Sequence, residues 1–210
     1  MIEDILPPEV EAFETFDDPP GTVLFPEEEA LIGRAVEKRR REFATARYCV
    51  RRAMGKLGMA PVPVLRGPRG EPTWPEGIAG SITHCTGYRA AALTRKPAMI
   101  GIDAEPDAPV GDDVIEAVSL PHEREMLRRL AITSPGPCWD RLLFSAKESV
   151  YKAWFPMTNR WLGFYDAEID VDPVGGTFSA HILAEGLRWQ GRWLIRNGLI
   201  VTAIARVGVS

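Results

Sequence analysis

Residues 99–106 read MIGIDAEP, and this stretch decides how the rest of the chain is interpreted. Its apolar run predicts a β-strand, which Pro106 ends. On a strand, Asp103 and Glu105 point to one face, ~7 Å apart, and Ile102 points to the other. Two carboxylates on one face repel each other unless a cation joins them. A metal site is one interpretation, and a solvated pair at a strand end is the other.

A helix predicted over Cys138–Phe155 supplies a third carboxylate. At 100° per residue, one apolar stripe of this helix faces a core, and Phe144, Tyr151 and Phe155 form a second stripe on the other side. Glu148 lies beside the second stripe. We therefore expect Glu148 to be partly buried and to need a cation or a hydrogen-bond partner.

Lys152 lies one turn after Glu148. The simplest interpretation of the two is a surface ion pair, worth about 0.3–0.5 kcal/mol. Taken together with Asp103 and Glu105, Glu148 instead completes a set of oxygen ligands. Such ligands suit Mg²⁺, which keeps several waters and also binds substrate phosphates. Both interpretations stay open on these residues alone.

A long helix predicted over Glu27–Leu57 carries a basic face. Arg40, Arg47 and Arg51 lie within about 40° of one another, beside the apolar stripe. Paired guanidinium donors at such a boundary are suited to holding phosphate. The other basic side chains point elsewhere and are interpreted as a solvated face: Lys38, Arg39, Arg41 and Arg52. A fully solvated basic helix is the alternative for the whole set.

Two short segments after this helix are candidates for contacting an anion. The loop Arg66–Pro72 has glycines that allow close backbone approach and arginines that favour anions. In the segment Ser81–Tyr88, Thr83 and His84 could bind a phosphate or a ribose, although a lone histidine at a strand end is more often structural. The pattern GxxxxGK[ST] is absent, which argues against a kinase or a P-loop NTPase.

The remaining pattern predicts an α+β fold of two subdomains side by side, residues 1–98 and 99–210, each a long helix packed on an antiparallel sheet. The proline-rich residues 1–26 read as an extended arm. Two short helices are predicted at Asp113–Val118 and Pro121–Leu130. Strands are predicted at Val62–Leu65, Gly80–Cys85, Ala90–Thr94, Met99–Glu105, Tyr165–Val171, Thr177–Ala184, Arg192–Ile195 and Leu199–Ala205. Asn197-Gly198 is a type I′ hairpin signal between the last two strands.

Composition narrows the class of protein. The chain has 210 residues, of which 45% are hydrophobic and 26% charged, ordinary values for a globular protein. A net charge of −4 argues against a general nucleic-acid binder. Three cysteines without a CxxC spacing are typical of reduced thiols in the cytoplasm. The sequence contains no run of ~18 apolar residues, so we expect no membrane-spanning helix. Its acidic first residues are unlike a secretory signal.

The order of the motifs is the most specific feature of the sequence. They are the basic helix with Arg47, then Arg69-Gly-Glu-Pro72, Ile82-Thr-His-Cys-Thr-Gly87, Gly101-Ile-Asp-Ala-Glu105 and Phe144-Ser-Ala-Lys-Glu-Ser-Val-Tyr-Lys152. In this order they resemble the 4′-phosphopantetheinyl transferases of the surfactin-synthetase and enterobactin-synthetase type, most closely the actinobacterial members. The last two motifs together carry most of the resemblance. Phe144 departs from the pattern, since many relatives have Trp there.

The resemblance implies roles for the acidic and lysine positions. Asp103, Glu105 and Glu148 would hold Mg²⁺, or Mn²⁺, on the pyrophosphate of coenzyme A. Lys152 would contact the phosphates and stabilise the leaving group, and Lys147 would also lie close to the phosphates. Glu148 is our candidate for the base that takes the proton of the attacking hydroxyl.

It also implies how coenzyme A binds as the substrate. His84 and Arg47 would bind its 3′-phosphate, and Arg69, Glu71 and Pro72 would border the adenine and ribose. The family fold is a pseudo-twofold pair of α+β halves with the site in the cleft between them.

The activity implied is transfer of 4′-phosphopantetheine from coenzyme A to a serine of an apo acyl or peptidyl carrier protein. Such carriers belong to polyketide, fatty-acid or nonribosomal peptide synthases, and neither nucleic acid nor a membrane is an expected partner. A cytoplasmic monomer is the simplest state. One rival is a Mg²⁺-dependent nuclease or phosphohydrolase, which would use the same residue types. Another is a non-catalytic binding protein, which would leave Asp103 and Glu105 unexplained.

Overall fold

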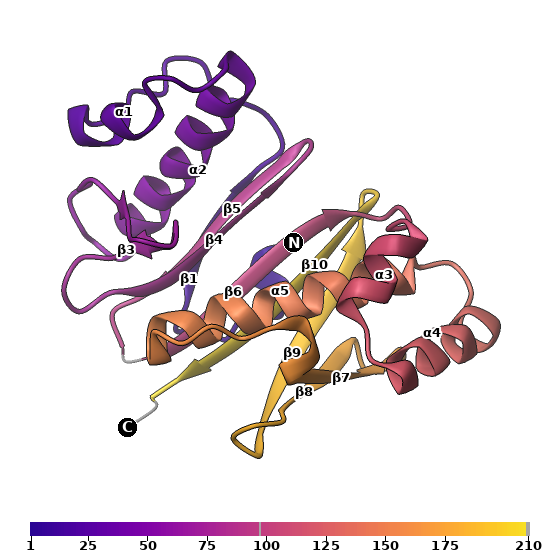
Figure 1. Cartoon of the computed structure of the whole chain (residues 1–210). Coiled ribbons are helices and arrows are strands. Elements are labelled where there is room, and N and C mark those ends of the chain that lie inside the picture. The colour runs from indigo at the N-terminus through magenta and orange to yellow at the C-terminus, as the bar shows by residue number, and fades with distance from the viewer. Residues whose placement is uncertain (97, 209–210) are drawn as a thin grey trace.

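The computed structural model describes residues 1–96 and 98–208, and it consists of two adjoining antiparallel sheets, each packed against a long helix (Figure 1). The first sheet has the order β1-β5-β4, from Glu11–Thr15, Tyr88–Thr94 and Ala79–Cys85, and packs against α2 (Glu37–Lys56). The second has the order β6-β10-β9-β8-β7, from Ala98–Pro106, Leu199–Val207, Leu187–Arg196, Thr177–Ile182 and Ala167–Asp172, and packs against α5 (Trp139–Thr158). This confirms a fold of helices and antiparallel sheets. The pseudo-twofold relation between the halves stays a prediction.

Shorter elements connect these layers. They are η1 (Ile2–Ile5), α1 (Pro26–Ile32), the small hairpin β2 (Leu65–Arg66) and β3 (Pro72–Thr73), α3 (Asp112–Val118), α4 (Pro121–Thr133) and η2 (Phe164–Asp166). No helix within residues 1–96 and 98–208 has both the length and the apolar character needed to cross a membrane. Cys49, Cys85 and Cys138 are all free thiols.

The two sheets meet where β4 runs beside β6. Ser81 Oγ accepts the backbone N–H of Ile102 at 3.1 Å, and Thr83 Oγ1 accepts that of Ala104 at 3.0 Å. Side-chain hydroxyls thus replace the backbone acceptors that a neighbouring strand would normally supply. Residue numbers rise together along both strands, so β4 and β6 run in the same direction. This junction brings the first half of the chain against the predicted carboxylate strand.

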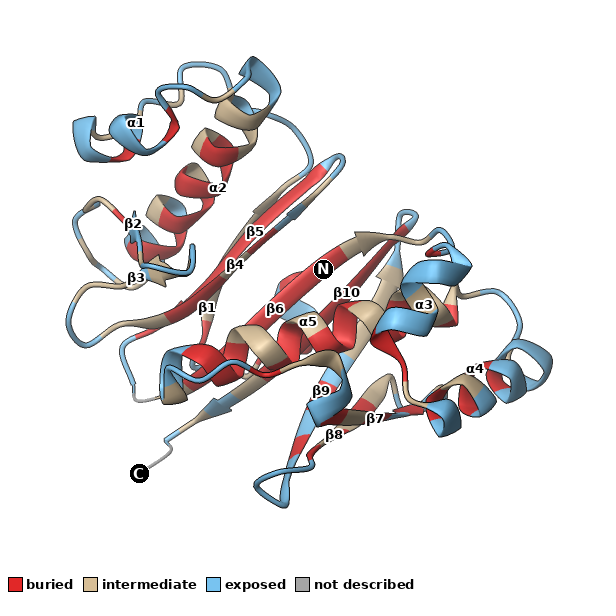
Figure 2. Ribbon diagram, in the orientation of Figure 1, coloured by how far each residue is buried: buried red, intermediate tan, exposed pale blue. Residues whose placement is uncertain are grey.

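Strand β5 is buried on both faces (Figure 2). Ala90 and Ala92 face the core that η1 shares with β6 and β10, whereas Ala91 and Leu93 face α2. Mostly small side chains at these positions let both layers approach the strand. The strand is therefore the centre of the first half.

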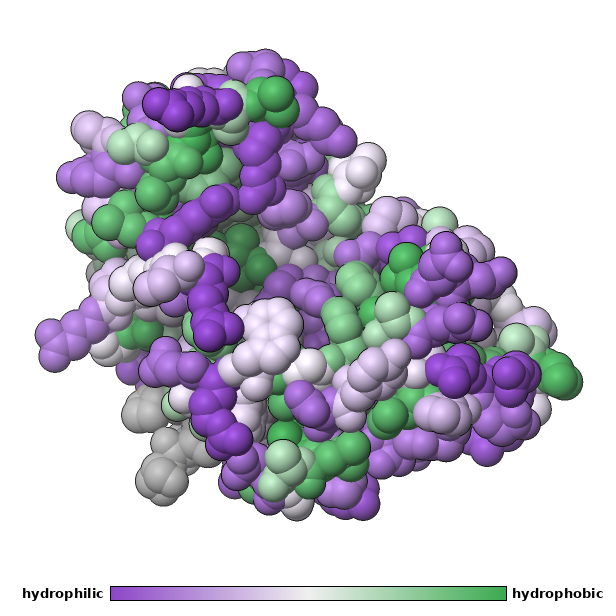
Figure 3. Space-filling view, in the orientation of Figure 1, coloured by the Kyte–Doolittle hydropathy of each residue, from purple (hydrophilic) through white to green (hydrophobic). Residues whose placement is uncertain are grey.

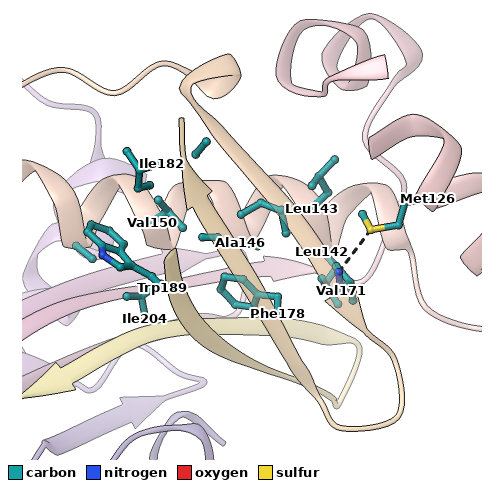
Figure 4. Packing of buried hydrophobic residues seen from close by; sticks show 14 of the residues in the cluster. Met126, Leu142, Leu143, Ala146, Val150, Val171, Phe178, Ile182, Trp189 and Ile204 are labelled. Carbon is teal, nitrogen blue, oxygen red and sulfur yellow. Dashed lines mark hydrogen bonds between the residues drawn. The ribbon is translucent and has the colours of Figure 1, made fainter. Parts of the chain in front are cut away.

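The predicted core stripe of α5 is confirmed. Its members all belong to the largest core cluster: Trp139, Leu142, Leu143, Ala146, Val150 and Trp154. Figure 4 shows Ala146 and Val150 above the second sheet, with Phe178 and Ile204 on the sheet side. Burying this stripe leaves the opposite side of α5, with Glu148 and Tyr151, to face the first half.

Strand β6 comes unusually close to α5 at Gly101. A Cβ at this position would lie 1.9 Å from the carbonyl O of Ser149 and 2.6 Å from the backbone N of Ala153. Gly101→Ala is therefore expected to lower the free energy of unfolding by about 3 kcal/mol or more, because strand and helix must separate. Chemical denaturation measures this. The matched control is Gly55→Ala at an exposed position of α2, where a Cβ would meet nothing within 4 Å in the described part of the chain. This variant should be more stable by about 1 kcal/mol, and equal stabilities of the two variants would contradict the prediction.

The prediction of one helix over Glu27–Leu57 is wrong, because residues 33–36 separate α1 from α2. Gly33 disfavours helix, and α1 folds back so that Glu28, 1% exposed, lies against α2. Arg40 Nη1 donates to the carbonyl O of Ile32 at 3.1 Å and so satisfies the end of α1.

Other elements differ in detail. The prediction of an extended arm over residues 1–26 is incomplete, since these residues contain η1 and β1. Strand β1 was missed because five residues are too few to show the alternation of apolar and polar residues. Strand β9 begins earlier than predicted, at Leu187. The hairpin signal is confirmed, because Asn197 and Gly198 have φ values of 56° and 70°, as a type I′ turn requires.

Candidate active site

A cleft opens between the two halves, with walls from α2, the loop between β2 and β3, β4, and α5. Hydrophilic residues gather around the recess between the halves (Figure 3). Its charged and titratable lining is Arg39, Arg47, Arg66, Arg69, Glu71, His84, Glu148, Tyr151 and Lys152. The arginines come from the first half and the Glu148–Lys152 face from α5, so the site requires both halves.

Asp103 is the centre of the acidic part of the site. It is 4% exposed, and its Oδ1 accepts from Lys152 Nζ at 2.7 Å and from Thr83 Oγ1 at 3.3 Å. Its Oδ2 accepts from Ser145 Oγ at 2.8 Å. The surface ion pair between Glu148 and Lys152, one of the two interpretations from sequence, is not formed, because Lys152 binds Asp103 from across the helix–strand interface.

The negative charge of Asp103 affects the pKa values of Glu148 and Glu105. Burial raises the pKa of Glu148 above its usual value; the Lys152 ammonium partly offsets this, and the Asp103 charge adds to it. Burial and the charge of Asp103 also raise the pKa of Glu105, against the lowering effect of Arg141, whose Nη1 lies 3.0 Å from Glu105 Oε2. The three predicted carboxylates therefore share one electrostatic environment.

The side chains of Asp103, Glu105 and Glu148 do not converge as the ligands of one metal ion among the described residues. Within residues 1–96 and 98–208, no three His, Cys, Asp or Glu side chains converge as metal ligands. The positive charge beside Asp103 and Glu105 comes from Lys152 and Arg141 instead. Ligation of Mg²⁺ by Asp103, Glu105 and Glu148 therefore stays a prediction.

The opposite wall of the cleft gathers positive charge. Arg47 is 5% exposed, and burial lowers its pKa to about 10, with Glu28 opposing the shift and Arg66 and Arg39 adding to it. Among the described residues, Arg47 Nε has no hydrogen-bond partner, and it lies 3.6 Å from Glu28 Oε1. Arginines that repel one another in a cleft favour an anion between them.

His84 adjoins this wall of arginines. Its Nε2 lies 3.0 Å from Arg39 Nη1, and because a guanidinium only donates, the ring must accept at Nε2 and carry its proton on Nδ1. Burial and the Arg39 charge lower the pKa of His84, which agrees with a neutral ring. The interpretation of Arg39 as part of a solvated face is wrong, because Arg39 lines the cleft and contacts His84 on β4.

The loop between β2 and β3 is held in shape by Glu71. Its Oε2 accepts the N–H of Arg69 at 2.9 Å, and its carbonyl O accepts the N–H of Gly67 at 2.8 Å. A Cβ at Gly67 would lie 2.0 Å from Glu71 Oε1, so a larger residue there would displace the carboxylate that accepts the N–H of Arg69. The Arg69 guanidinium then lies over the Phe155 ring of α5, 5.7 Å from its centroid. The loop thus joins the two walls of the cleft.

Four residues predicted to bind the substrate have other partners and do not line the cleft. Arg40 binds the end of α1, as described above. Arg51 pairs with Glu28, and Thr83 lies beneath Asp103. Lys147 is 3% exposed and pairs with Glu123 on α4, away from the cleft. Arg40, Arg51 and Thr83 were predicted from their own helix or strand, and Lys147 from the family resemblance. In each case a residue on another element takes up the donor.

A second hollow adjoins the cleft beyond Glu148. It shares Arg69, Glu148 and Tyr151 with the cleft and is completed by Lys147, residues 161–164 and Ala167. We call it the aromatic pocket. The Tyr151 and Trp161 rings lie 5.1 Å apart at its mouth, and Trp161 is 64% exposed. Of the second apolar stripe predicted on α5, Tyr151 lines both hollows and Phe155 lines the cleft.

Sequence reasoning missed several residues of the site. Glu28 gave a recognisable signal, because it lies three residues after Phe25 and its Oε2 accepts the Phe25 N–H as a helix cap. Glu123 gives the same signal, because it lies three residues after Leu120 and its Oε2 accepts the Leu120 N–H. Arg141 gave no local signal, since its partner Glu105 lies far along the chain.

Comparison with known proteins agrees with this architecture. The sequence model of the 4′-phosphopantetheinyl transferase N-terminal domain matches residues 27–94, and that of the 4′-phosphopantetheinyl transferase superfamily matches residues 99–204. The chain is 52% identical over 204 residues to 4′-phosphopantetheinyl transferase Svp of Streptomyces mobaraensis, covering 92% of this chain and 83% of Svp. It is 48% identical over 206 residues to PptT of Mycobacterium tuberculosis, covering 91% and 89% of the two chains. It is also 48% identical over 223 residues to Npt of Nocardia iowensis, covering 98% and 99%. The chain therefore belongs to the 4′-phosphopantetheinyl transferase superfamily.

Proposed function

We propose that the cleft binds coenzyme A and that the protein transfers its 4′-phosphopantetheine arm to a serine of apo acyl or peptidyl carrier proteins. The products are the holo-carrier and adenosine 3′,5′-bisphosphate. One observation carries the proposal: a single cleft combines a guanidinium and imidazole cluster from the first half with Glu148 and Lys152 from the second, and Lys152 in turn binds the buried Asp103. Coenzyme A matches both clusters, because it carries a 3′-phosphate and a pyrophosphate on opposite sides of one ribose.

We assign the 3′-phosphate to Arg39, Arg47, Arg66 and His84. A phosphate dianion would relieve the repulsion among the three arginines, and its oxygens would accept charge-assisted hydrogen bonds. The adenine and ribose would lie along the loop Arg69–Pro72, whose shape Glu71 maintains. Binding at this end uses the first half of the chain only.

The acidic cluster fits Mg²⁺ in donor chemistry. Asp103, Glu105 and Glu148 offer only oxygen ligands, and the raised pKa values of the two glutamates indicate that their negative charge is incompletely compensated. Bound there, Mg²⁺ would neutralise charge that builds up on the pyrophosphate. In this structure Lys152 and Arg141 supply the positive charge beside Asp103 and Glu105.

The chain's own residues would manage the proton and the leaving group. The carrier serine Oγ bonds to the β-phosphorus of coenzyme A, and the bond from that phosphorus to the bridging oxygen breaks. Glu148, half-buried with a raised pKa, would take the serine proton, directly or through water. Lys152 at the cleft surface would stabilise charge on the departing 3′,5′-bisphosphate. No covalent intermediate with the enzyme is required.

We assign the pantetheine arm to the aromatic pocket. This pocket begins at Glu148, where the pyrophosphate would end, and offers the faces of Tyr151, Trp161 and Phe164. An uncharged arm of methyl groups and amides suits such a lining better than the arginine wall does. The carrier protein would then approach beside Glu148.

The proposal extends to setting and partners. We expect carriers of polyketide, fatty-acid or nonribosomal peptide synthases, a cytoplasmic monomer, and no nucleic-acid substrate. The nuclease alternative gains no support, since the related proteins are named as transferases.

Mass spectrometry of a panel of apo-carriers after incubation with coenzyme A and Mg²⁺ tests the function. We expect one phosphopantetheine on the carrier serine and release of adenosine 3′,5′-bisphosphate. Carriers whose serine is changed to alanine are the control. Unmodified carriers throughout, or cleavage of DNA or RNA by the same preparation, would refute the proposal.

The 3′-phosphate assignment has a sharp test in Arg47→Ala. Loss of a charge-assisted hydrogen bond, worth about 1.5–3 kcal/mol, should weaken coenzyme A binding roughly 10–150-fold. Binding of 3′-dephospho-coenzyme A should not change, because it lacks the group that Arg47 contacts. Arg52→Ala is the matched control on the same helix, since its guanidinium stacks on Phe13 away from the cleft. Calorimetry that shows equal losses for both ligands would contradict the assignment.

A further inference from the structure

A buried ion pair beside the aromatic pocket has no part in the chemistry proposed above. Lys147 Nζ and Glu123 Oε2 lie 2.7 Å apart, and their side chains are 1% and 0% exposed. Burying two charges is costly and contributes little net stability, so a pair of this kind serves best where it specifies one arrangement.

Each remaining bond of this pair reaches a different segment. Lys147 Nζ also donates to the carbonyl O of Phe164 at 2.7 Å. Glu123 Oε1 accepts the N–H of Ile169 at 2.8 Å, and Glu123 Oε2 accepts that of Leu120 at 2.7 Å. The pair therefore ties α5 to the start of α4, to η2 and to β7.

The segment that Lys147 holds is a wall of the aromatic pocket. Phe164 follows directly on Trp161, Leu162 and Gly163, and these residues line the pocket together with Lys147 itself. The facing wall on α5 carries Glu148, the next residue after Lys147. Successive residues on a helix point about 100° apart, so the lysine can hold the far wall while Glu148 faces the cleft.

We propose that Lys147 and Glu123 are positioning residues, which hold residues 161–164 against α5 so that the pantetheine arm is aligned with Glu148, and that Lys147 does not contact the phosphates. This inference rests on the proposed function of the cleft. It replaces the direct phosphate role that the family resemblance implies for Lys147, because Glu123 Oε2 and the carbonyl O of Phe164 already bind its ammonium group.

Two ligands separate positioning from phosphate contact. Coenzyme A and 3′-phosphoadenosine 5′-diphosphate carry the same phosphates, but the second lacks the pantetheine arm. For Lys147→Met and Glu123→Gln, calorimetry should show about 10-fold weaker binding of coenzyme A and unchanged binding of 3′-phosphoadenosine 5′-diphosphate, with kcat/KM for carrier modification reduced about 10–100-fold. The double variant should lose no more coenzyme A affinity or kcat/KM than the single variant with the larger loss. The reason is that both substitutions break the same ion pair.

The double variant also guards against misfolding, because it leaves no unpaired charge in the interior, and thermal unfolding of each variant identifies those that are folded. The matched control is Glu185→Gln, which removes the exposed ion pair of Arg160 in the neighbouring segment and should leave both affinities unchanged.

The outcomes are distinct. If Lys147→Met weakens both ligands equally while Glu123→Gln weakens neither, Lys147 contacts the phosphates and the positioning role is wrong. A folded double variant with wild-type coenzyme A affinity and wild-type kcat/KM would also overturn it. Failure of the wild-type protein to bind coenzyme A would instead refute the proposed function of the cleft.

Discussion

Glu148→Gln is expected to lower kcat for carrier modification by roughly 10²–10⁴-fold. The amide keeps the size of the side chain but cannot take a proton from the carrier serine. Burial raises the pKa of Glu148, which makes it a stronger base than an exposed glutamate, so its loss should be large. The rate of holo-carrier formation, followed by mass spectrometry, measures the effect.

Binding measurements separate this role from substrate binding. Coenzyme A affinity without added Mg²⁺ should change little in Glu148→Gln, because the arginine wall holds the 3′-phosphate independently. Glu125→Gln is the control, since Glu125 is an exposed helix carboxylate paired only with Arg128. A Glu148→Gln enzyme with nearly wild-type kcat would assign the proton transfer to another group.

Asp103→Asn is expected to reduce kcat/KM roughly 10³-fold. The Asp103 carboxylate holds Lys152 at 2.7 Å, and a neutral amide would leave the ammonium free to pair with Glu148. That new ion pair would move Lys152 from its position and lower the pKa of the proposed base. One substitution thus disturbs both groups that the proposed chemistry needs.

A control exists within the same hydrogen-bond network. Ser145→Ala removes the donor to Asp103 Oδ2 but keeps the charge that holds Lys152, so it should affect stability, by about 1–3 kcal/mol, more than catalysis. Equal losses of activity in Asp103→Asn and Ser145→Ala would mean that packing around Asp103 matters rather than its charge. Urea denaturation and steady-state kinetics of both variants make the comparison.

Several features of the site could be predicted from residues 99–106 and from α5. The two-residue period of a strand places Gly101, Asp103 and Glu105 on the face toward α5, and Ile102 in the opposite core. The helical period of α5 buries one stripe and leaves Glu148 beside Tyr151 on the cleft side. These are backbone properties, so they hold whatever the rest of the chain does.

Predictions that depended on contacts between two different helices or strands were less successful. The break at Gly33 was missed because the pattern of charges continues through it, and the error misplaced Arg39 and Arg40. The sequence also left the ion-pair partner of Lys152 undecided, since Glu148 lies one turn away on the same helix. The structure selects Asp103, which is buried and already accepts two other hydrogen bonds.

The sequence by itself determined which face each chemical group occupies on its own helix or strand, and it determined the order of motifs that the superfamily shares. Only the tertiary structure decided which groups meet: Lys152 with Asp103, Arg39 with His84, and Lys147 with Glu123. The physical reason is the distance along the chain over which each effect acts. Backbone period acts over a few residues, whereas each of these contacts joins elements at least 24 residues apart and exists only after helices and sheets have packed.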